Sequence, residues 1–349
     1  MGNSQWRLET TLNLTLLNAK DAGVLDQIEI IVSDWGSVIP LKDVLSLVPE
    51  AEKKVKFLHI PKKISDKEQK DSKFAEVLAL NAAARRTEGH YIGRIDNDTV
   101  IGKEFFVHFF SIIEGGGHEY FDIQNSYLFV ERRSVPYRFT SRSFSMRYVQ
   151  LFLFLFGSKL KIETAEEFGT PFWNSPVGIM IFHRKIWDSC KGYDQKLLYW
   201  GWMESDLALR LKKKHDLIDF KVFVGNHFFH LEHYSSLTAY KDRNGPATPR
   251  KKNPKKMKGL SYTVNDENWG LFNYSFKLQR YTIKEVKNYN LPYGRNVGWL
   301  NLSIKFTSVL ALIFLDQVKG IGIEELRNNL GKLKVKLGMI RTIIRNNQP

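Results

Sequence analysis

Two acidic residues one position apart are the clearest chemical signal in the chain. Asp96 and Asp98 come directly after the apolar run of residues 91–95. A strand that ends in such a pair can aim both carboxylates at one divalent cation, because Mg²⁺ and Mn²⁺ accept carboxylate oxygens as ligands. The same spacing also occurs in capped turns. The pair therefore predicts a metal site but, taken alone, leaves a structural role open.

A second acidic pair and three histidines follow later in the chain. Glu204 and Asp206 lie at the start of an expected helix, where they could serve as a general base or simply favour the helix dipole. His227, His230 and His233 recur every three residues. In a helix they would share one face, whereas in a strand His227 would face away from His230. We expect His233 to be the single metal ligand, with a hydrogen-bonded structural histidine as the alternative.

The elements that must position these groups alternate in type over the first 115 residues. Apolar spacing predicts helices over residues 8–25 and 73–86, and strands over residues 28–32, 55–59 and 91–95. Strands separated by helices predict a mostly parallel sheet, whose ligands bind at the carboxyl ends of the strands. The Asp96/Asp98 pair lies at such an end.

The rest of the chain changes character twice. Residues 121–186 look rich in strands and end in a strand followed by a short helix. Residues 241–258 contain glycine and prolines, with seven basic side chains over residues 243–258, which indicates either a solvated loop or a lid that orders over a diphosphate. Residues 323–344 carry an apolar heptad pattern with basic flanks, as in a helix that packs, self-associates or lies on an acidic membrane.

Composition narrows the class of protein. The chain has 349 residues, a net charge of +15 and one cysteine, Cys190, which argues against a disulfide framework and for a reducing compartment. The charge implies an anionic partner: nucleic acid, a nucleotide diphosphate or an acidic membrane. The first 20 residues show no signal peptide, and the uncharged runs 148–158 and 306–315 are too short to span a bilayer. We therefore expect a cytoplasmic protein with possible peripheral membrane contact, and a buried strand or core helix at each uncharged run.

Four segments, in order, resemble glycosyltransferases of the GT-A fold, particularly family 2, with a galactosyltransferase-like C-terminal half. Residues 31–37 (Ile-Val-Ser-Asp-Trp-Gly-Ser) are similar to that family's Val-Asp-Asp-Gly-Ser motif. Residues 73–98 are similar to its Lys, Asn-x-Ala and Asp-x-Asp sequence, and residues 192–210 to its Trp-Gly-x-Glu-Asp-x-Asp-Leu-x-x-Arg motif. The segment His230-Leu-Glu-His233 stands where these enzymes often place a metal-binding histidine.

The resemblance implies an α/β fold of GT-A (Rossmann-like) type, with a mostly parallel central sheet flanked by helices. It divides the chain into a catalytic domain over residues 1–275, with a donor half to about 115 and an acceptor half after it, and a basic helical extension over 276–349. The implied activity is metal-dependent transfer of a sugar from a nucleotide-sugar donor, UDP-sugar favoured, to a hydroxyl of a glycan, lipid-linked or protein acceptor. Inversion at the anomeric carbon is favoured.

The resemblance also assigns roles to single residues. Mn²⁺, or Mg²⁺, would bind Asp98 and His233, and imidazole favours Mn²⁺. Glu204 or Asp206 would be the catalytic base. Trp173 and Trp202 could form an apolar platform for the acceptor sugar; a core aromatic is an equal alternative for Trp173 and a weaker one for Trp202, which lies inside the acidic motif. The residues expected to bind the donor are Asp34, Lys73, Asn81, Arg94, Asp96 and Asp98.

Three departures from the family pattern qualify these roles. Matching Leu207 and Arg210 puts Met203 at the family's Glu and Glu204 at its catalytic Asp, whereas a slide of one residue would leave Asp206 as the base. Trp35 replaces the second Asp of the base-binding motif. The family's first strand is missing or reduced to residues 1–6, so the chain start is not the natural one, the sheet is completed differently, or donor binding is weakened. A catalytically inactive scaffold and a nucleic-acid-binding protein remain the alternatives.

Overall fold

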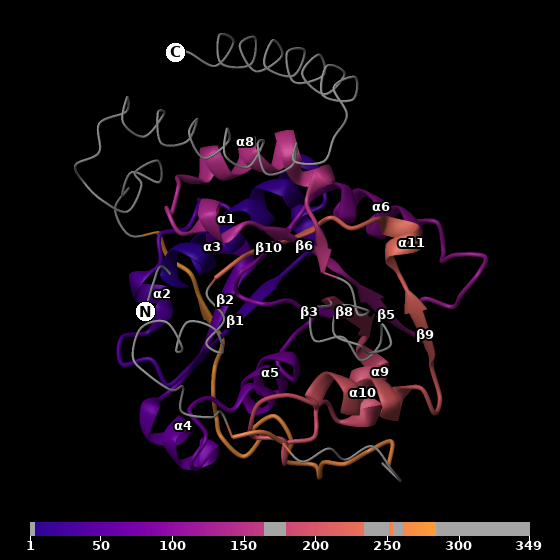
Figure 1. The fold of residues 1–349 in the computed structure, drawn as a ribbon. Coiled ribbons are helices and arrows are strands. Elements are labelled where there is room, and N and C mark those ends of the chain that lie inside the picture. Colours follow the sequence, from indigo (N-terminus) through magenta and orange to yellow (C-terminus); the bar gives the residue numbers. More distant parts are fainter. Residues whose placement is uncertain (1–3, 164–178, 234–250, 254–260, 284–349) are drawn as a thin grey trace.

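The computed structural model describes residues 4–163, 179–233, 251–253 and 261–283. Their strands form three mixed sheets (Figure 1). The first has the order β1 (Ile30–Trp35), β2 (Val55–Ile60), β11 (Gln279–Arg280). The second has the order β4 (Thr99–Ile101), β10 (Phe228–Leu231), β6 (Arg132–Val135), β7 (Ile162–Glu163). The third has the order β3 (Tyr91–Arg94), β8 (Ile179–His183), β5 (Ser126–Val130), β9 (Asp216–Asp219).

Helices separate and cover these sheets. The longer ones are α1 (Ser4–Asp21), α4 (Lys62–Gln69), α5 (Glu76–Ala84), α6 (Lys103–Glu114), α8 (Met146–Phe156), α9 (Arg184–Cys190) and α10 (Met203–Leu211). The short ones are α2 (Leu41–Val44), α3 (Ala51–Lys54), α7 (Tyr137–Thr140) and α11 (Lys221–Val224), with 3-10 turns at Leu25–Gln27 and Gly157–Lys159. In Figure 1, α1, α6 and α8 lie above the strands, and α5, α9 and α10 lie below them.

The sheets are mixed, which corrects the expectation of a mostly parallel sheet. Among the described strands, β1 with β2, β5 with β9 and β6 with β10 are the parallel pairs. The other five pairings are antiparallel. Strand direction depends on contacts between distant segments, so the local alternation of helix and strand could not fix it.

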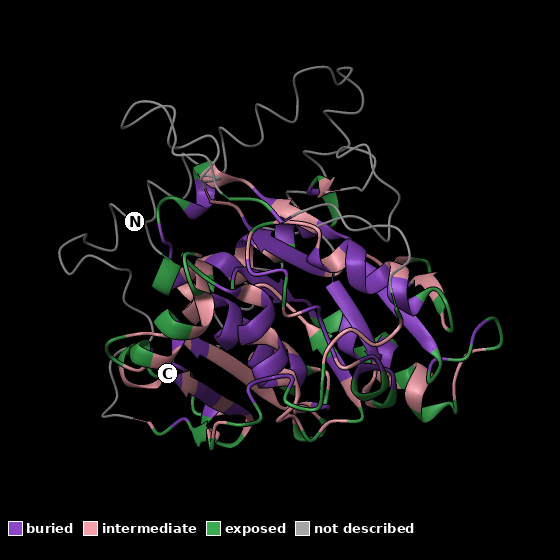
Figure 2. Cartoon of the chain, turned by 90° about the horizontal axis from the view of Figure 1, so that it is seen from below, coloured by how far each residue is buried: buried purple, intermediate pink, exposed green. Residues whose placement is uncertain are grey.

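The third sheet is buried on both faces, because alternate residues of a strand point in opposite directions. Leu128 and Ile181 pack toward α6, in a cluster that includes Phe105 and Phe109. Tyr127 and Phe182 point the other way, toward α5, α9 and α10. The residues of the two inner strands, β8 and β5, are almost all buried, and Figure 2 shows buried residues gathered inside the fold with exposed ones around its outside.

Helix α1 lies at the centre of the fold, since its side chains reach three separate cores. Leu12 and Leu16 pack with the first sheet, Trp6 and Leu14 with α8 and the second sheet, and Ala19 with α6. An N-terminal helix buried to this extent fixes how the three sheets lie relative to one another.

Most of the predicted elements are confirmed, with shifted ends. The predicted helix at 73–86 begins only at Glu76, and the uncharged run at 148–158 is a helix, α8, rather than a strand. Tyr281 is buried against Leu45 and Leu47, so the body of the fold continues beyond residue 275. No helix in the described ranges is long and apolar enough to cross a membrane. The run 306–315, the heptad segment and most of the basic loop lie outside the described residues.

Asn81 joins α5 to the turn after α9. Its side chain is fully buried, its Nδ2 donates to the Tyr193 carbonyl oxygen (2.9 Å), and its Oδ1 accepts from the Tyr193 N–H (2.9 Å). Gly192, with φ +70°, allows the backbone to come this close, because an added Cβ would lie 2.3 Å from Asn81 Oδ1. Both polar ends of the amide are therefore engaged within the protein.

We predict that Asn81→Ala lowers the free energy of unfolding by about 2–4 kcal/mol, because it leaves buried backbone groups of Tyr193 without their partner. Urea unfolding followed by circular dichroism measures the loss. Lys73→Ala, at an exposed position close by, is the control and should change stability by less than about 0.5 kcal/mol. Equal stability of Asn81→Ala and the unmodified protein would contradict the structural role.

Candidate active site

Asp98, His230 and His233 form a group that could hold a metal ion. Their ligand atoms all lie within 4.8 Å of one another. The Asp98 Oδ2 atom lies 3.2 Å from His233 Nε2 and 3.7 Å from His230 Nε2. Asp98 and His230 are almost fully buried, and His233 is partly exposed, so the group opens to solvent on one side.

The second sheet brings these residues together. Strand β10 pairs antiparallel with β4, which sets His230 opposite Thr99, and the Leu231 N–H donates to the Asp98 carbonyl oxygen (2.7 Å). Since Asp98 immediately precedes β4, the pairing places it beside His230. His227 precedes β10, outside this group. The structure therefore groups His230, as well as the predicted ligand His233, with Asp98.

Electrostatic attraction between Asp98 and the two histidines stabilises this group of three residues. Burial alone would raise the pKa of Asp98, but hydrogen bonds from His230 and His233 outweigh it and hold that pKa far below its ordinary value. Burial would lower the pKa of His230, yet its contacts with Asp98 and Glu163 raise it to about 9. An imidazolium thus lies between two carboxylates, where the field would equally favour a metal cation.

Glu163 orients His230 from the side opposite Asp98. Its Oε1 lies 2.7 Å from His230 Nδ1, and its Oε2 accepts from Arg132 Nε (2.8 Å). A carboxylate on the far nitrogen of an imidazole fixes the ring and its tautomer, as is usual for histidines that bind metals. Two imidazoles and one carboxylate are a donor set that suits Mn²⁺ better than Mg²⁺.

Asp96 does not share the metal position. Its Oδ1 lies 2.8 Å from Arg94 and its Oδ2 lies 2.7 Å from Arg132. The two acids therefore diverge: Asp98 meets the histidines, and Asp96 binds two arginines. Both guanidinium groups are nearly buried. The side chains of Asp96 and Asp98 therefore do not point toward one common cation position.

Arg94 links this group to Glu204. Its guanidinium contacts Glu76 (2.8 Å) as well as Asp96, and lies 3.4 Å from Glu204 Oε1. Burial raises the pKa of Glu204 to about 7, against the opposing charge of Arg94. Burial raises the pKa of the nearby Tyr127 and Tyr193 hydroxyls, and the charge of Glu204 adds to that rise. A carboxyl group with a pKa near 7 is suited to take up a proton at neutral pH.

Asp206 is occupied elsewhere. It is buried and binds Arg210 Nε (2.8 Å), one helical turn further along α10. Arg210 in turn donates to the carbonyl oxygens of Gly192 (2.7 Å) and Tyr262 (3.0 Å). The pair therefore ties α10 to its neighbours, which favours Glu204 over Asp206 as the base.

The remaining expected donor and acceptor residues are spread out. Asp34 is fully buried, with Oδ2 accepting from the Leu41 N–H (2.8 Å) and lying 2.9 Å from His59 Nδ1. Asn81 has the structural contacts described above, and Lys73 is exposed. Trp202 precedes α10 with φ 71°, a strained backbone for a residue other than glycine, and is partly buried. Trp173 lies outside the described residues.

The sequence analysis considered His230 without choosing it as a ligand, and it missed four other residues of the site: Arg7, Glu76, Arg132 and Glu163. Arg7, from α1, is half-buried, and its charge interacts with that of Asp98. The other residues reach the site because strands or helices that are far apart in the sequence pack against one another. Neither a scan of protein-family models nor a search of curated proteins finds a match for this chain.

We predict that Mn²⁺ raises the melting temperature of the protein by several degrees, because a ligand that binds only the native state stabilises it. Asp98→Ala and His230→Ala should each abolish the shift in a thermal denaturation assay with and without metal. His227→Ala, which removes a nearby histidine outside the group, should keep it. A full shift in both site variants would mean that the metal binds elsewhere.

We also predict that Glu204→Gln makes the protein more stable above pH 7. A carboxyl group whose pKa rises from 4.5 to about 7 on folding favours the native state at low pH and opposes it as pH rises through that range. The variant should therefore gain up to about 3 kcal/mol at pH 8 and little at pH 4. Urea unfolding at both pH values measures the difference, and a gain of equal size at both would contradict the assigned pKa.

Proposed function

We propose that this protein is a metal-dependent glycosyltransferase that uses a nucleotide-sugar donor, with UDP-sugars favoured, and inverts the anomeric carbon. The observation that carries the proposal is the joining of two chemical groups in one buried network. The metal group of Asp98, His230 and His233 connects through Arg132, Asp96 and Arg94 to Glu204. One group suits a diphosphate with its metal, and the other suits deprotonation of a hydroxyl.

The reaction needs both groups at once. Glu204 takes the proton from an acceptor hydroxyl, whose oxygen then forms a bond to the anomeric carbon of the donor sugar. The bond from that carbon to the diphosphate oxygen breaks, and the electron pair leaves with the diphosphate. Mn²⁺ bound by Asp98, His230 and His233 would supply positive charge to stabilise that leaving group. Direct displacement of this kind inverts the anomeric carbon.

The protein's own charges prepare this step. The Arg94 guanidinium lies 3.4 Å from Glu204 and also contacts Glu76 and Asp96. Because burial outweighs the effect of Arg94, the Glu204 carboxylate can still accept a proton near neutral pH. Arg132 pairs with Asp96, which points away from the histidines, and with Glu163, which also contacts His230.

The acceptor is the least constrained part of the proposal. A glycan, a lipid-linked sugar and a protein hydroxyl would all present the same reacting oxygen to Glu204. Trp202, beside Glu204 in the chain, supports a sugar acceptor, since an aromatic face packs well against a sugar ring. The nucleic-acid alternative rests on the net charge of +15 and on the abundant aromatic residues. It predicts oligonucleotide binding that weakens steeply with salt and does not depend on Asp98.

We predict that kcat/KM for sugar transfer rises with pH and levels off above about 7, because the base must be deprotonated to act. Glu204→Gln should lower kcat by about 10²–10⁴-fold and retain metal-dependent nucleotide binding. Asp98→Asn should lose that binding. Isothermal titration with UDP and Mn²⁺, together with a transfer assay over a panel of UDP-sugars, separates these effects.

The matched control is Asp206→Asn, which alters the neighbouring acid of the same helix. It should lower stability through Arg210 but, in protein that remains folded, leave the pH profile of the reaction unchanged. Glu204→Gln with undiminished turnover would rule out Glu204 as the base. Absence of nucleotide binding at any metal concentration would favour an inactive scaffold.

A further inference from the structure

The turn that leads into α10 has a strained backbone. Gly201 and Trp202 both have left-handed φ angles, +84° and +71°. Glycine adopts this conformation freely, whereas a residue with a Cβ adopts it at a cost. Trp202 also stands at the N-cap of the helix, where its side chain makes no cap hydrogen bond. Such strain persists only where the surrounding structure holds it in place, and it gathers at functional sites.

Asn253 holds this turn from a segment further along the chain. It is only 4% exposed, and its Nδ2 donates to the carbonyl oxygens of Tyr199 (2.6 Å) and Gly201 (2.8 Å). The Leu197 carbonyl oxygen lies 3.3 Å from the same nitrogen. Asn253 Oδ1 accepts from the Tyr199 N–H (2.9 Å), and the Asn253 N–H donates to the Trp200 carbonyl oxygen (3.1 Å). One buried residue thus pairs with successive backbone groups of the turn, which are costly when left unpaired.

Lys251 extends the contact between the two segments. Its carbonyl oxygen accepts from the Trp200 N–H (3.3 Å). Its Nζ donates to Asp71 Oδ2 (2.6 Å) and to the Tyr199 hydroxyl (2.9 Å). The Lys251 and Asp71 side chains are mostly exposed, so their ion pair adds little to stability. The buried amide of Asn253, rather than the exposed charges, is therefore the main restraint on the turn.

The restrained turn determines where Glu204 lies. Helix α10 begins at Met203, so Glu204 belongs to its first turn and moves with the start of the helix. The Glu204 side chain is 14% exposed, and its Oε1 lies 3.4 Å from the Arg94 guanidinium. A change in φ at Trp202 would rotate the first turn of the helix and carry this carboxyl group away from Arg94. The contact between Glu204 and Arg94 therefore depends on the left-handed conformation of the turn.

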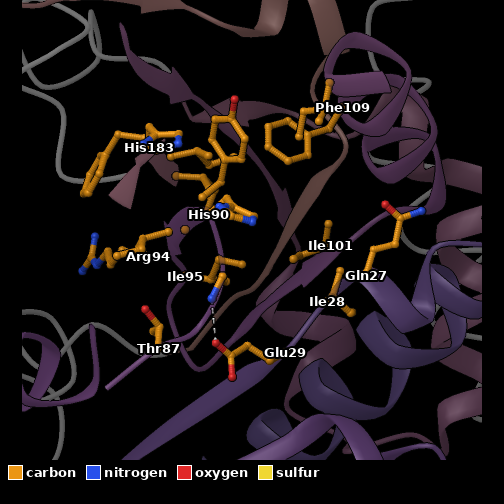
Figure 3. A pocket seen from close by; sticks show the side chains of 18 of the residues that line it. Gln27, Ile28, Glu29, Thr87, His90, Arg94, Ile95, Ile101, Phe109 and His183 are labelled. Atoms are coloured by element: carbon orange, nitrogen blue, oxygen red, sulfur yellow. Dashed lines mark hydrogen bonds between the residues drawn. The ribbon is translucent and has the colours of Figure 1, made fainter. Parts of the chain in front are cut away.

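On the side of Arg94 the packing is less complete. Strand β3, which ends at Arg94, pairs with β8 and with no other strand of the described chain. Its residues line a cavity of about 810 Å³, and Figure 3 shows Arg94 and Ile95 among the side chains around it. Fewer packing contacts lower local stability. A firm start of α10 is therefore needed to keep Glu204 at a fixed distance from Arg94.

We propose that Asn253 is a positioning residue: its amide holds the strained turn of residues 197–202 and thereby places Glu204 beside Arg94. The consequence for catalysis rests on the proposed function, in which Glu204 is the base. Asn253 acts through Glu204 and not on the reacting atoms. A merely structural asparagine would add stability without affecting the surroundings of Glu204, and this difference can be measured.

The first measurement does not require the reaction. Glu204→Gln is introduced into the unmodified chain and into the Asn253→Ala chain, and the melting temperature of each protein is measured at pH 4 and pH 8. In the unmodified chain, Glu204→Gln should raise the melting temperature more at pH 8 than at pH 4, because a buried carboxylate opposes folding. In the Asn253→Ala chain we expect this difference to fall to about half or less, because a displaced carboxyl group regains contact with water.

The matched control is Asn13→Ala in α1. Asn13 is also buried, and its side chain binds the Ser46 carbonyl oxygen (3.1 Å) and the Val48 N–H (2.8 Å). This variant should lower the melting temperature and leave the pH-dependent effect of Glu204→Gln unchanged. Equal effects of the two alanine variants on that difference overturn the proposal, as does its absence from the unmodified chain. If Asn253→Ala does not fold, Asn253→Gln, which shifts the amide by one methylene, takes its place.

The second measurement tests the catalytic consequence. Asn253→Ala should lower kcat for sugar transfer by about 10–100-fold, because the base is displaced. The KM for the UDP-sugar and the binding of UDP with Mn²⁺ should change by less than about twofold, since the metal group is unaltered. Unchanged kcat in Asn253→Ala overturns the positioning role. A reduced pH-dependent difference in a protein that transfers no sugar supports the placement of Glu204 by Asn253 and contradicts the proposed function instead.

Discussion

The arrangement of the site depends on a row of buried ion pairs, in which two arginines must stay in contact with their carboxylate partners. Arg94 and Arg132 are nearly removed from water, and each is compensated by carboxylates from different elements. An uncompensated charge in such a place costs several kcal/mol, so the elements that supply the partners must stay together. Asp96, bonded to both arginines, is the centre of the row and joins the second sheet to the third.

This row explains why the two acids after β3 have different neighbours. Asp96 forms ion pairs with both arginines, whereas Asp98 contacts the histidines. Burial raises the pKa of Glu204, and Arg94 offsets this only in part because it also pairs with Glu76 and Asp96. The proposed metal binding and the proposed proton uptake would thus depend on one electrostatic balance, although the residues proposed for them come from different sheets and helices.

Local patterns predicted what depends on neighbours in sequence and missed what depends on distant pairing. The order of helices and strands up to residue 115, the strand-helix unit after residue 178 and the acidic residues all follow from spacing. The link between Asp206 and Arg210 also lies four residues apart, so helical spacing could have identified it. In contrast, Glu163 and His230 are in contact although they lie 67 residues apart in the sequence, and no periodic pattern could predict that contact. The mixed strand directions were missed for the same reason.

Strand β3 connects the third sheet to the row of buried charges, because its last residue, Arg94, contacts Asp96 and Glu204. In the described part of the chain, β3 is held in its sheet by antiparallel pairing with β8. In the proposed reaction a support that shifts by about 1 Å would lower the rate, since reacting groups must be held in place. The pairing of β3 with β8 therefore bears both on the proposed base, Glu204, and on the Asp96–Asp98 turn.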